Sequence, residues 1–162
     1  MKGLQELRGA LAGFLREHGL EAVTAWGPER RPRAGGPVAA VSLRGFESGP
    51  PGFQDYLGER YDEAKGGWEE LYGKRVELTF GLDVYAASAQ GVQAGLDILQ
   101  EALGEKGPAG LCPVGLTVGE TAFQSGSGRY CCPVQARFWV WAVAVSREDG
   151  AFLDFEVRGE RV

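Results

Sequence analysis

The sequence predicts an α+β fold in which two helices pack on one face of a mostly antiparallel sheet of about six strands. Residues 75–85 alternate apolar and polar side chains, which is the period of a strand with one buried face. Residues 3–18 and 88–103 repeat apolar side chains every three or four positions, as amphipathic helices do. The order is helix, three strands, helix, three strands, and two helices are too few for a β-α-β alternation. The length of 162 residues fits a single domain, 1–162.

Glycine and proline bound the first elements. The apolar stripe of residues 3–18 ends before Gly19, at a position where helices often stop. Residues 21–26 (EAVTAW) and 38–43 (VAAVSL) are predicted strands. Between them, residues 27–37 (GPERRPRAGGP) hold three prolines and three glycines, which exclude regular structure.

Residues 45–74 are predicted to form a long loop. No periodicity persists through them, and they contain Gly-Pro-Pro-Gly at 49–52. From Glu47 to Glu70 there are seven acids and two bases, which equals the net charge of −5 for the whole chain. Loops beyond about 12–15 residues are usually functional or disordered, and disordered segments hold few aromatic residues. We therefore expect this acidic, aromatic-rich loop to become ordered against a partner; a loop packed on its own domain and a hairpin extension are the alternatives. The candidate assembly residues are Phe53, Asp55, Tyr56, Glu59, Asp62, Glu63 and Trp68.

The strand at 75–85 is predicted to be the centre of the fold. The helix that follows begins after Ser88, a good N-cap residue, and ends at Gly104. We expect this helix to cover the apolar face of the strand, which leaves Glu77, Thr79 and Asp83 towards solvent or a neighbouring subunit. That apolar face consists of Val76, Leu78, Phe80, Leu82 and Val84.

Three further strands are predicted at 113–119, 134–145 and 152–159, with Ser125–Gly128 as a hairpin connection. The segment VQARFWVWAVAV at 134–145 is apolar on both faces. Unless a helix covers the second face, its tryptophans form an exposed patch, and such patches mark interfaces. The candidate interface face is formed by Trp139 and Trp141.

The residues that could carry chemistry are few. His18 is the only histidine and stands at the end of a helix, where a surface or capping role is expected. Cys112, Cys131 and Cys132 show neither a disulfide pattern nor the spacing of zinc ligands. Residues 67–74 superficially resemble a phosphate loop, but they have the wrong glycine spacing and precede a strand. We therefore expect no enzyme activity and no catalytic, cofactor-binding or metal site.

The composition of the chain argues against two classes of partner, nucleic acid and membranes. A net charge of −5 does not provide the basic surface with which proteins bind duplex nucleic acid. No apolar run approaches the ~20 residues needed to cross a bilayer, and the N-terminus lacks the pattern of a secretory signal. The cytoplasm is therefore the expected compartment.

Six segments together resemble a known family. DYLGE (55–59) and ELYGKRVELTFGLDVYA (70–86) are followed by the helix AQGVQAGLDILQEAL (89–103), and then by LCPVGLTVGE, ARFWVWAVA and FLDFEVRG (111–120, 136–144 and 152–159). In this order they resemble the tail-terminator, or tail-completion, proteins of long-tailed bacteriophages and prophages. The last three look like the variants found in prophages of Gram-positive bacteria.

The resemblance implies a virion assembly function. It implies a structural subunit that forms a homohexameric ring, or is monomeric when free, and that caps the tail tube, ends its polymerisation and provides a surface for head joining. The implied partners are the tail-tube protein and the head–tail connector protein. The implied location is the host cytoplasm during assembly and then the virion tail. DNA would pass through the lumen without specific binding, and Glu59, Asp62 and Glu63 could line that channel because like charges repel.

Three alternatives remain open. Head–tail connector, or neck, proteins of the same phages are also small ring-forming subunits. A cysteine-dependent intracellular enzyme would use Cys112, Cys131 or Cys132. A monomeric intracellular binding domain would show the mass of a single subunit in solution.

Overall fold

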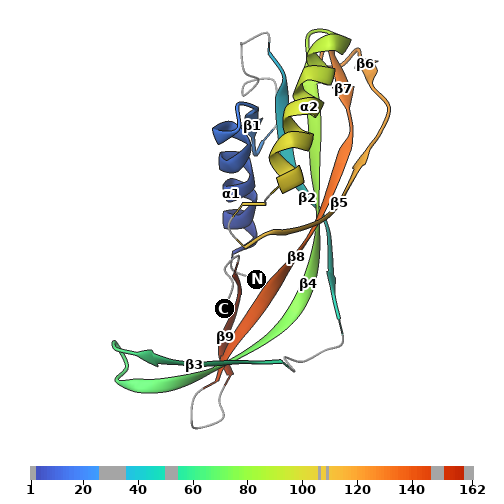
Figure 1. The fold of residues 1–162 in the computed structure, drawn as a ribbon. Coiled ribbons are helices and arrows are strands. Elements are labelled where there is room, and N and C mark those ends of the chain that lie inside the picture. The colour runs from blue at the N-terminus through green and yellow to red at the C-terminus, as the bar shows by residue number, and fades with distance from the viewer. Residues whose placement is uncertain are drawn as a thin grey trace.

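The computed structural model describes residues 3–25, 36–49, 55–105, 107–108, 110–146 and 152–158, which form two helices and nine strands (Figure 1). The helices are α1 (Leu4–Glu17) and α2 (Ala89–Glu105). The first four strands are β1 (Glu21–Val23), β2 (Val38–Ser48), β3 (Asp55–Asp62) and β4 (Gly67–Ala86). After α2 come β5 (Cys112–Val118), β6 (Ala122–Gln124), β7 (Arg129–Cys132), β8 (Val134–Ser146) and β9 (Phe152–Arg158).

The α+β class is therefore confirmed, whereas the predicted strand count and order are wrong. The described elements run α-β-β-β-β-α-β-β-β-β-β, with three strands more than the six expected. Two of the additional strands, β6 and β7, have three and four residues and are too short to show a period. They pair across residues 125–128, so the predicted hairpin connection is confirmed.

The third additional strand overturns the predicted loop at 45–74. Residues 45–48 belong to β2, residues 55–62 form β3, and residues 67–74 are the first part of β4. β3 and β4 pair with each other as an antiparallel hairpin. The hairpin extension, which the sequence left as an alternative, is the correct description.

β4 is the central strand, as predicted, but it is much longer than expected. Its 20 residues span roughly 65 Å at the usual rise per residue. β2 and β3 share one of its edges, and β7 and β8 share the other. β5 and β9 then pair with β8. Among the described strands, all pairs are antiparallel except that of β1 with β2.

Both helices lie on one face of the sheet, over its upper half in Figure 1. The predicted apolar face of β4, from Val76 to Val84, is fully buried beneath them. Phe80 of β4 and Phe138 of β8 meet edge to face at 5.9 Å in the middle of this core. The helices contribute leucines at helical spacing, namely Leu7, Leu11 and Leu15 from α1 and Leu96, Leu99 and Leu103 from α2.

The helix ends follow the sequence signals. Gly19 has φ +88°, and its N–H donates to Arg16 O, while the N–H of Leu20 donates to Leu15 O. These two bonds form a Schellman motif, which needs the left-handed conformation that glycine adopts easily. At the start of α2, Ser88 Oγ accepts a hydrogen bond from Gly91 N at 3.0 Å. The predicted end of α1 and the predicted start of α2 are confirmed, whereas α2 continues through Gly104, its predicted end, to Glu105. No helix among the described residues is long and apolar enough to span a membrane.

The buried face of β4 changes along the strand. From Val76 to Val84 the buried large side chains stand at even positions, under the helices. Between Gly67 and Gly73 the buried residues stand at odd positions, which face the other side of the sheet. A Cβ on Gly73 would meet Leu57 Cδ1 at 2.5 Å and Trp141 Cε3 at 3.2 Å, so these two side chains cover the strand at Gly73. β4 therefore serves two different packing environments.

Candidate functional site

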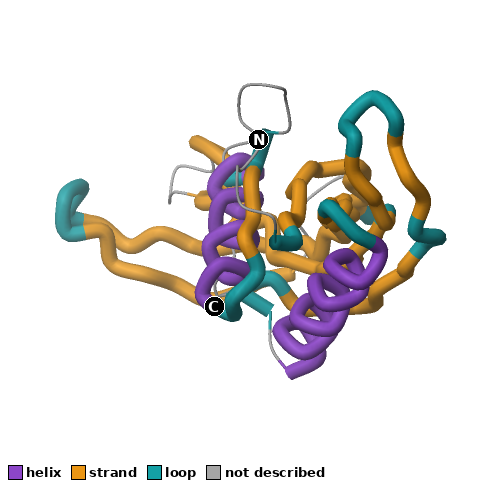
Figure 2. Tube along the Cα trace, turned by 90° about the horizontal axis from the view of Figure 1, so that it is seen from above, coloured by secondary structure: helices purple, strands orange, loops and turns teal. Residues whose placement is uncertain are grey.

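Residues 55–73, which we name the arm, extend beyond the helix-covered part of the molecule. The arm consists of β3, the turn 63–66 and the first seven residues of β4. Figures 1 and 2 show it as a two-stranded ribbon that projects to one side of the helices. In its outer part the strands pair only with each other, with Tyr61 opposite Trp68 and Asp62 opposite Gly67. A two-stranded ribbon has little core of its own, so local contacts must hold it in shape.

The turn at the tip is closed by Asp62. Its carboxylate oxygen Oδ1 accepts hydrogen bonds from Ala64 N at 3.0 Å and Lys65 N at 3.3 Å. Gly66 has φ +65°, and its N–H donates to Asp62 O at 2.8 Å. An aspartate that bonds its own turn, followed by a glycine in the left-handed region, is a common hairpin connection.

Glu69 anchors one face of the arm. Its side chain is nearly buried, with only 2% of the residue exposed, although the ribbon there is two strands wide. Its oxygens accept hydrogen bonds from Arg60 Nε at 3.1 Å and from Lys65 Nζ at 3.0 Å. Lys65 Nζ also lies 3.3 Å from Asp62 Oδ2. The hydrogen bond from Lys65, with that from Arg60, holds the pKa of Glu69 below its usual value.

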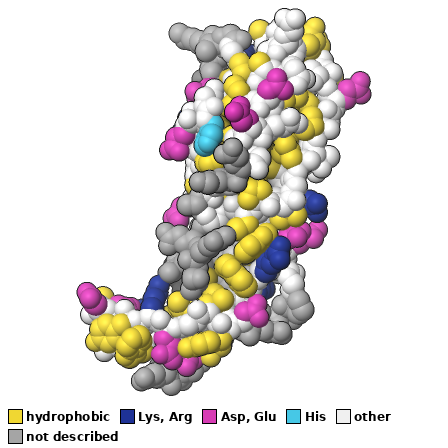
Figure 3. Space-filling view, viewed as in Figure 1, with side chains coloured by type: hydrophobic (Ala, Val, Ile, Leu, Met, Phe, Trp, Pro, Cys, Tyr) yellow, Lys and Arg dark blue, Asp and Glu magenta, His cyan; other side chains and the backbone are white. Residues whose placement is uncertain are grey.

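The other face of the arm is aromatic and acidic, and we name it the aromatic face. Tyr61 and Trp68 meet edge to face at 5.5 Å, and Tyr56 and Tyr72 do so at 5.6 Å. Tyr72 Oη donates to Glu70 Oε2 at 2.9 Å. Tyr56, Tyr61 and Trp68 are each more than half exposed. The members of the aromatic face are Tyr56, Glu59, Tyr61, Trp68, Glu70 and Tyr72. Figure 3 shows hydrophobic and acidic side chains gathered at the tip of the arm.

The arm carries an excess of negative charge. It holds six acids and two bases, which gives a net charge of −4. Both bases, Arg60 and Lys65, are engaged with Glu69, and Lys65 also with Asp62. The remaining acids are exposed and form no ion pair with the bases of the arm; they are Asp55, Glu59, Glu63 and Glu70. The uncompensated negative charge of the arm therefore comes from four carboxylates that surround a group of aromatic rings.

The predicted tryptophans lie on the face of the sheet that the helices leave open. Trp139 and Trp141 of β8 are half-buried and meet edge to face at 6.0 Å. The guanidinium of Arg75 on β4 lies over the Trp139 ring, 4.6 Å from its centroid. Arg137 is exposed on the same face, two residues before Trp139. We name this group, Arg75, Arg137, Trp139 and Trp141, the tryptophan face.

The structure thus brings most of the predicted assembly residues together on the arm, but in different roles. Tyr56, Glu59 and Trp68 belong to the aromatic face, whereas Asp62 closes the turn. Asp55 and Glu63 are exposed at the start of β3 and in the turn, and Phe53 lies outside the described residues. The sequence reasoning did not single out the other residues of the site, namely Tyr61, Glu69, Glu70, Tyr72, Arg75 and Arg137. The turn DEAKGG at 62–67, which has Tyr56 and Tyr61 before it and Trp68 and Tyr72 after it, is the signal that could have revealed them.

The cysteines and the histidine occupy ordinary structural positions. Cys131 and Cys132 are buried and Cys112 is half-buried, and all three are free thiols. Burial raises the pKa of Cys131, which makes its reactive thiolate scarce. His18 is exposed at the end of α1, where its Nδ1 lies 2.8 Å from Phe14 O, as expected for a capping residue. The described residues contain no group of three or more His, Cys, Asp or Glu that could hold a metal ion.

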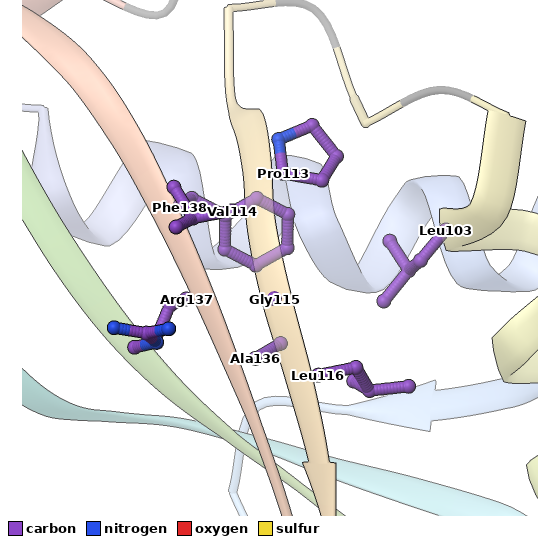
Figure 4. A pocket seen from close by; sticks show the side chains of 8 residues that line it. All are labelled: Leu103, Pro113, Val114, Gly115, Leu116, Ala136, Arg137 and Phe138. Carbon is purple, nitrogen blue, oxygen red and sulfur yellow. The ribbon is translucent and has the colours of Figure 1, made fainter.

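One pocket of about 160 Å³ lies between β5, β8 and the end of α2 (Figure 4). Its lining is apolar apart from Arg137, whose side chain lies on the side of β8 away from Leu103. Apolar pockets with a few convergent polar groups are typical ligand sites, and a single arginine does not make such a group. The other lining residues are Leu103, Pro113, Val114, Gly115, Leu116, Ala136 and Phe138.

The described residues form an α+β fold with a projecting aromatic arm and a second aromatic surface on its open sheet face. No protein-family model matches the chain, and no curated protein is significantly similar to it.

Proposed function

We propose that this chain is a structural subunit that assembles into a ring, caps the tail tube of a long-tailed phage and ends the polymerisation of that tube. The ring then provides the surface to which the head joins. The proposal starts from the segments at 55–59 and 70–86 that resemble tail-terminator proteins, and these segments form most of β3 and β4.

The arm is the observation that carries this proposal. Tyr56, Tyr61 and Trp68 are more than half exposed and contribute nothing to the core beneath the helices. Exposed aromatic clusters are unusual on soluble monomers and mark surfaces that other molecules cover. The turn and the ion pairs of Glu69 keep the arm ordered without a partner, so it can present these rings in a fixed arrangement.

A ring subunit needs two different surfaces, because a head-to-tail contact joins one side of each copy to another side of the next. The aromatic face of the arm and the tryptophan face are two such surfaces, and they lie on opposite faces of the sheet. An enzyme built on the cysteines is less well supported, because two of them are buried and the pKa of Cys131 is raised.

The test combines the purified chain with the tail-tube protein of the same phage and examines the products by negative-stain electron microscopy. We expect tubes that stop growing and that carry a six-fold ring at one end. Tubes of the same indeterminate length with and without the chain would contradict the proposal. Binding to the connector protein but not to the tube would favour the neck protein instead.

A variant without thiols tests the alternative that the chain is a cysteine-dependent enzyme. Replacing Cys112, Cys131 and Cys132 together with alanine removes every thiol without burying a hydroxyl group. We expect this variant to terminate tubes as the native chain does. A loss of termination in a variant that remains folded would make the thiols part of the function.

A further inference from the structure

We propose that the aromatic face of one copy binds the tryptophan face of the next copy, so that the two surfaces are the two halves of one repeated contact. The proposal rests on the ring-forming function for the closure of the assembly. It assigns the partner of the arm: a second copy of this chain.

The two surfaces point in opposite directions. Trp68, Glu70 and Tyr72 stand at even positions of β4, and Arg75 stands at an odd position of the same strand. Successive side chains of a strand point to opposite faces, so the aromatic face and the tryptophan face look away from each other. Two copies in the same orientation can then overlap, with the arm of one against the open sheet face of the next. This gives a head-to-tail contact and not a two-fold dimer.

The two surfaces carry opposite charges. The aromatic face holds two carboxylates, Glu59 and Glu70, and no base. The tryptophan face holds two exposed arginines. The acid beside them on β4 is Glu77, which lies opposite Trp139. An arm placed against another arm would bring two surfaces of net charge −4 together, which is unfavourable. An arm placed against the tryptophan face brings carboxylates to arginines.

The side chains of the two surfaces are of types that bind one another. Arginine binds both carboxylates and the faces of aromatic rings, and Arg75 already lies on one such ring in its own chain. Tyrosine, tryptophan and arginine are the residues that dominate the energetics of protein interfaces. Together the two surfaces contribute three tyrosines, three tryptophans and two arginines, which suits a contact that is both apolar and oriented.

The test uses charge reversal on each surface of the full chain. One variant carries Glu59→Arg and Glu70→Arg, and the other carries Arg75→Glu and Arg137→Glu. In the first variant both surfaces are basic, and in the second both are acidic, so neither variant should bind to itself. An equal mixture has complementary surfaces at every contact between unlike copies, and alternating copies close a ring with an even number of subunits.

Analytical ultracentrifugation measures the outcome. We expect the native chain to self-associate, each variant alone to associate about tenfold or more weakly, and the mixture to recover the native assembly. The proposal is overturned if the native chain is monomeric both alone and on tail tubes. It is equally overturned if either variant assembles as the native chain does, or if the mixture fails to recover.

A second pair of variants does not depend on charge. Trp68 and Phe123 are exposed to nearly the same extent, 57% and 58%, but Phe123 lies on the β6–β7 hairpin, outside both surfaces. We expect Trp68→Ala to weaken self-association about tenfold or more and Phe123→Ala to leave it unchanged. Equal effects of the two substitutions would contradict the assigned contact.

The two proposals can fail separately. Rings that terminate tubes normally in both charge variants would refute this contact and leave the proposed function intact. A mixture that assembles through the assigned contact but never terminates tubes would support the contact and refute the function.

Discussion

The side chain of Leu57 lies directly over the backbone of Gly73, so that a Cβ at position 73 would stand 2.5 Å from Leu57 Cδ1. Leu57 is the extra residue at the irregularity where β3 shifts its register against β4, between Tyr56 and Gly58. The contact therefore joins the base of the arm to the part of the sheet that pairs with β8.

Gly73→Ala should weaken the arm at its base. The added methyl group must displace Leu57, and overpacking of this kind costs about 1–3 kcal/mol. Hydrogen exchange at the amides of residues 55–73 is the measurement. We expect the substitution to lower the protection of these amides and to leave the protection of the helices unchanged. Adding Leu57→Ala to the same chain should restore part of the protection. Gly67→Ala is the control, because a Cβ there meets nothing within 4 Å.

The tip of the arm should loosen in acid. The pKa of Glu69 lies below its usual 4.5, chiefly through the hydrogen bond from Lys65. A lowered folded pKa means that this contribution to stability is complete above about pH 4.5 and is lost as the pH falls through the folded pKa. The pKa of Lys65 is raised above 10.5, mainly by the same bond, so its contribution is lost only as the pH rises through that higher value.

The NMR shift of the Trp68 indole measures this dependence. It should be constant at neutral pH and should change as Glu69 is protonated. The Glu69→Gln variant, which cannot lose a charge there, should show no such change. An identical acid transition in that variant would assign the transition to another group.

Ser88→Ala should destabilise the whole domain, because α2 covers the core. The serine hydroxyl accepts the bond from Gly91 N, and loss of such a cap costs about 1 kcal/mol. Urea denaturation followed by circular dichroism measures the loss. Ser88→Asp keeps an oxygen at the same place and should retain the native stability. Equal stability of all three chains would show that the cap contributes nothing.

Leu78→Ala should be far more damaging than Leu43→Ala. Leu78 is 0% exposed in the core of β4, whereas Leu43 on β2 is 37% exposed. A large-to-small change in a packed core costs about 2–5 kcal/mol, since it loses buried area and leaves a cavity. We expect less than about 1 kcal/mol for Leu43→Ala. Comparable losses in the two variants, again measured by urea denaturation, would mean that Leu43 is covered in solution.

The sequence predicts well those parts of the fold that pack against the helices. The even positions of β4, from Val76 to Val84, are buried as their alternation indicates. Gly19 and Ser88 mark the ends of helices because the motifs there depend on local hydrogen bonds. In such segments one rule, a single apolar face against a single core, determines both the pattern and the structure.

The arm could not be predicted in the same way, because its buried and exposed positions do not follow one alternation of apolar and polar side chains. The outermost of its buried odd positions is filled by a charged residue, Glu69, which pairs with Arg60 and Lys65. Its exposed side carries the rings of Tyr61 and Trp68, which a sequence pattern would place inside. The change of buried face between Gly73 and Val76 also breaks the alternation in the middle of one strand. The prediction that Glu59, Asp62 and Glu63 line a DNA channel stays a prediction.

The change of buried face in β4 also limits how the length of the chain can vary. One residue inserted between Gly73 and Val76 would turn the rings of the arm to the opposite side of the sheet while the core beneath the helices kept its place. Two residues added to each strand of the arm would instead preserve its sides and extend its reach by about 7 Å. The arm can therefore be lengthened or shortened by two residues in each strand, and its reach can in this way match the size of the neighbouring molecule.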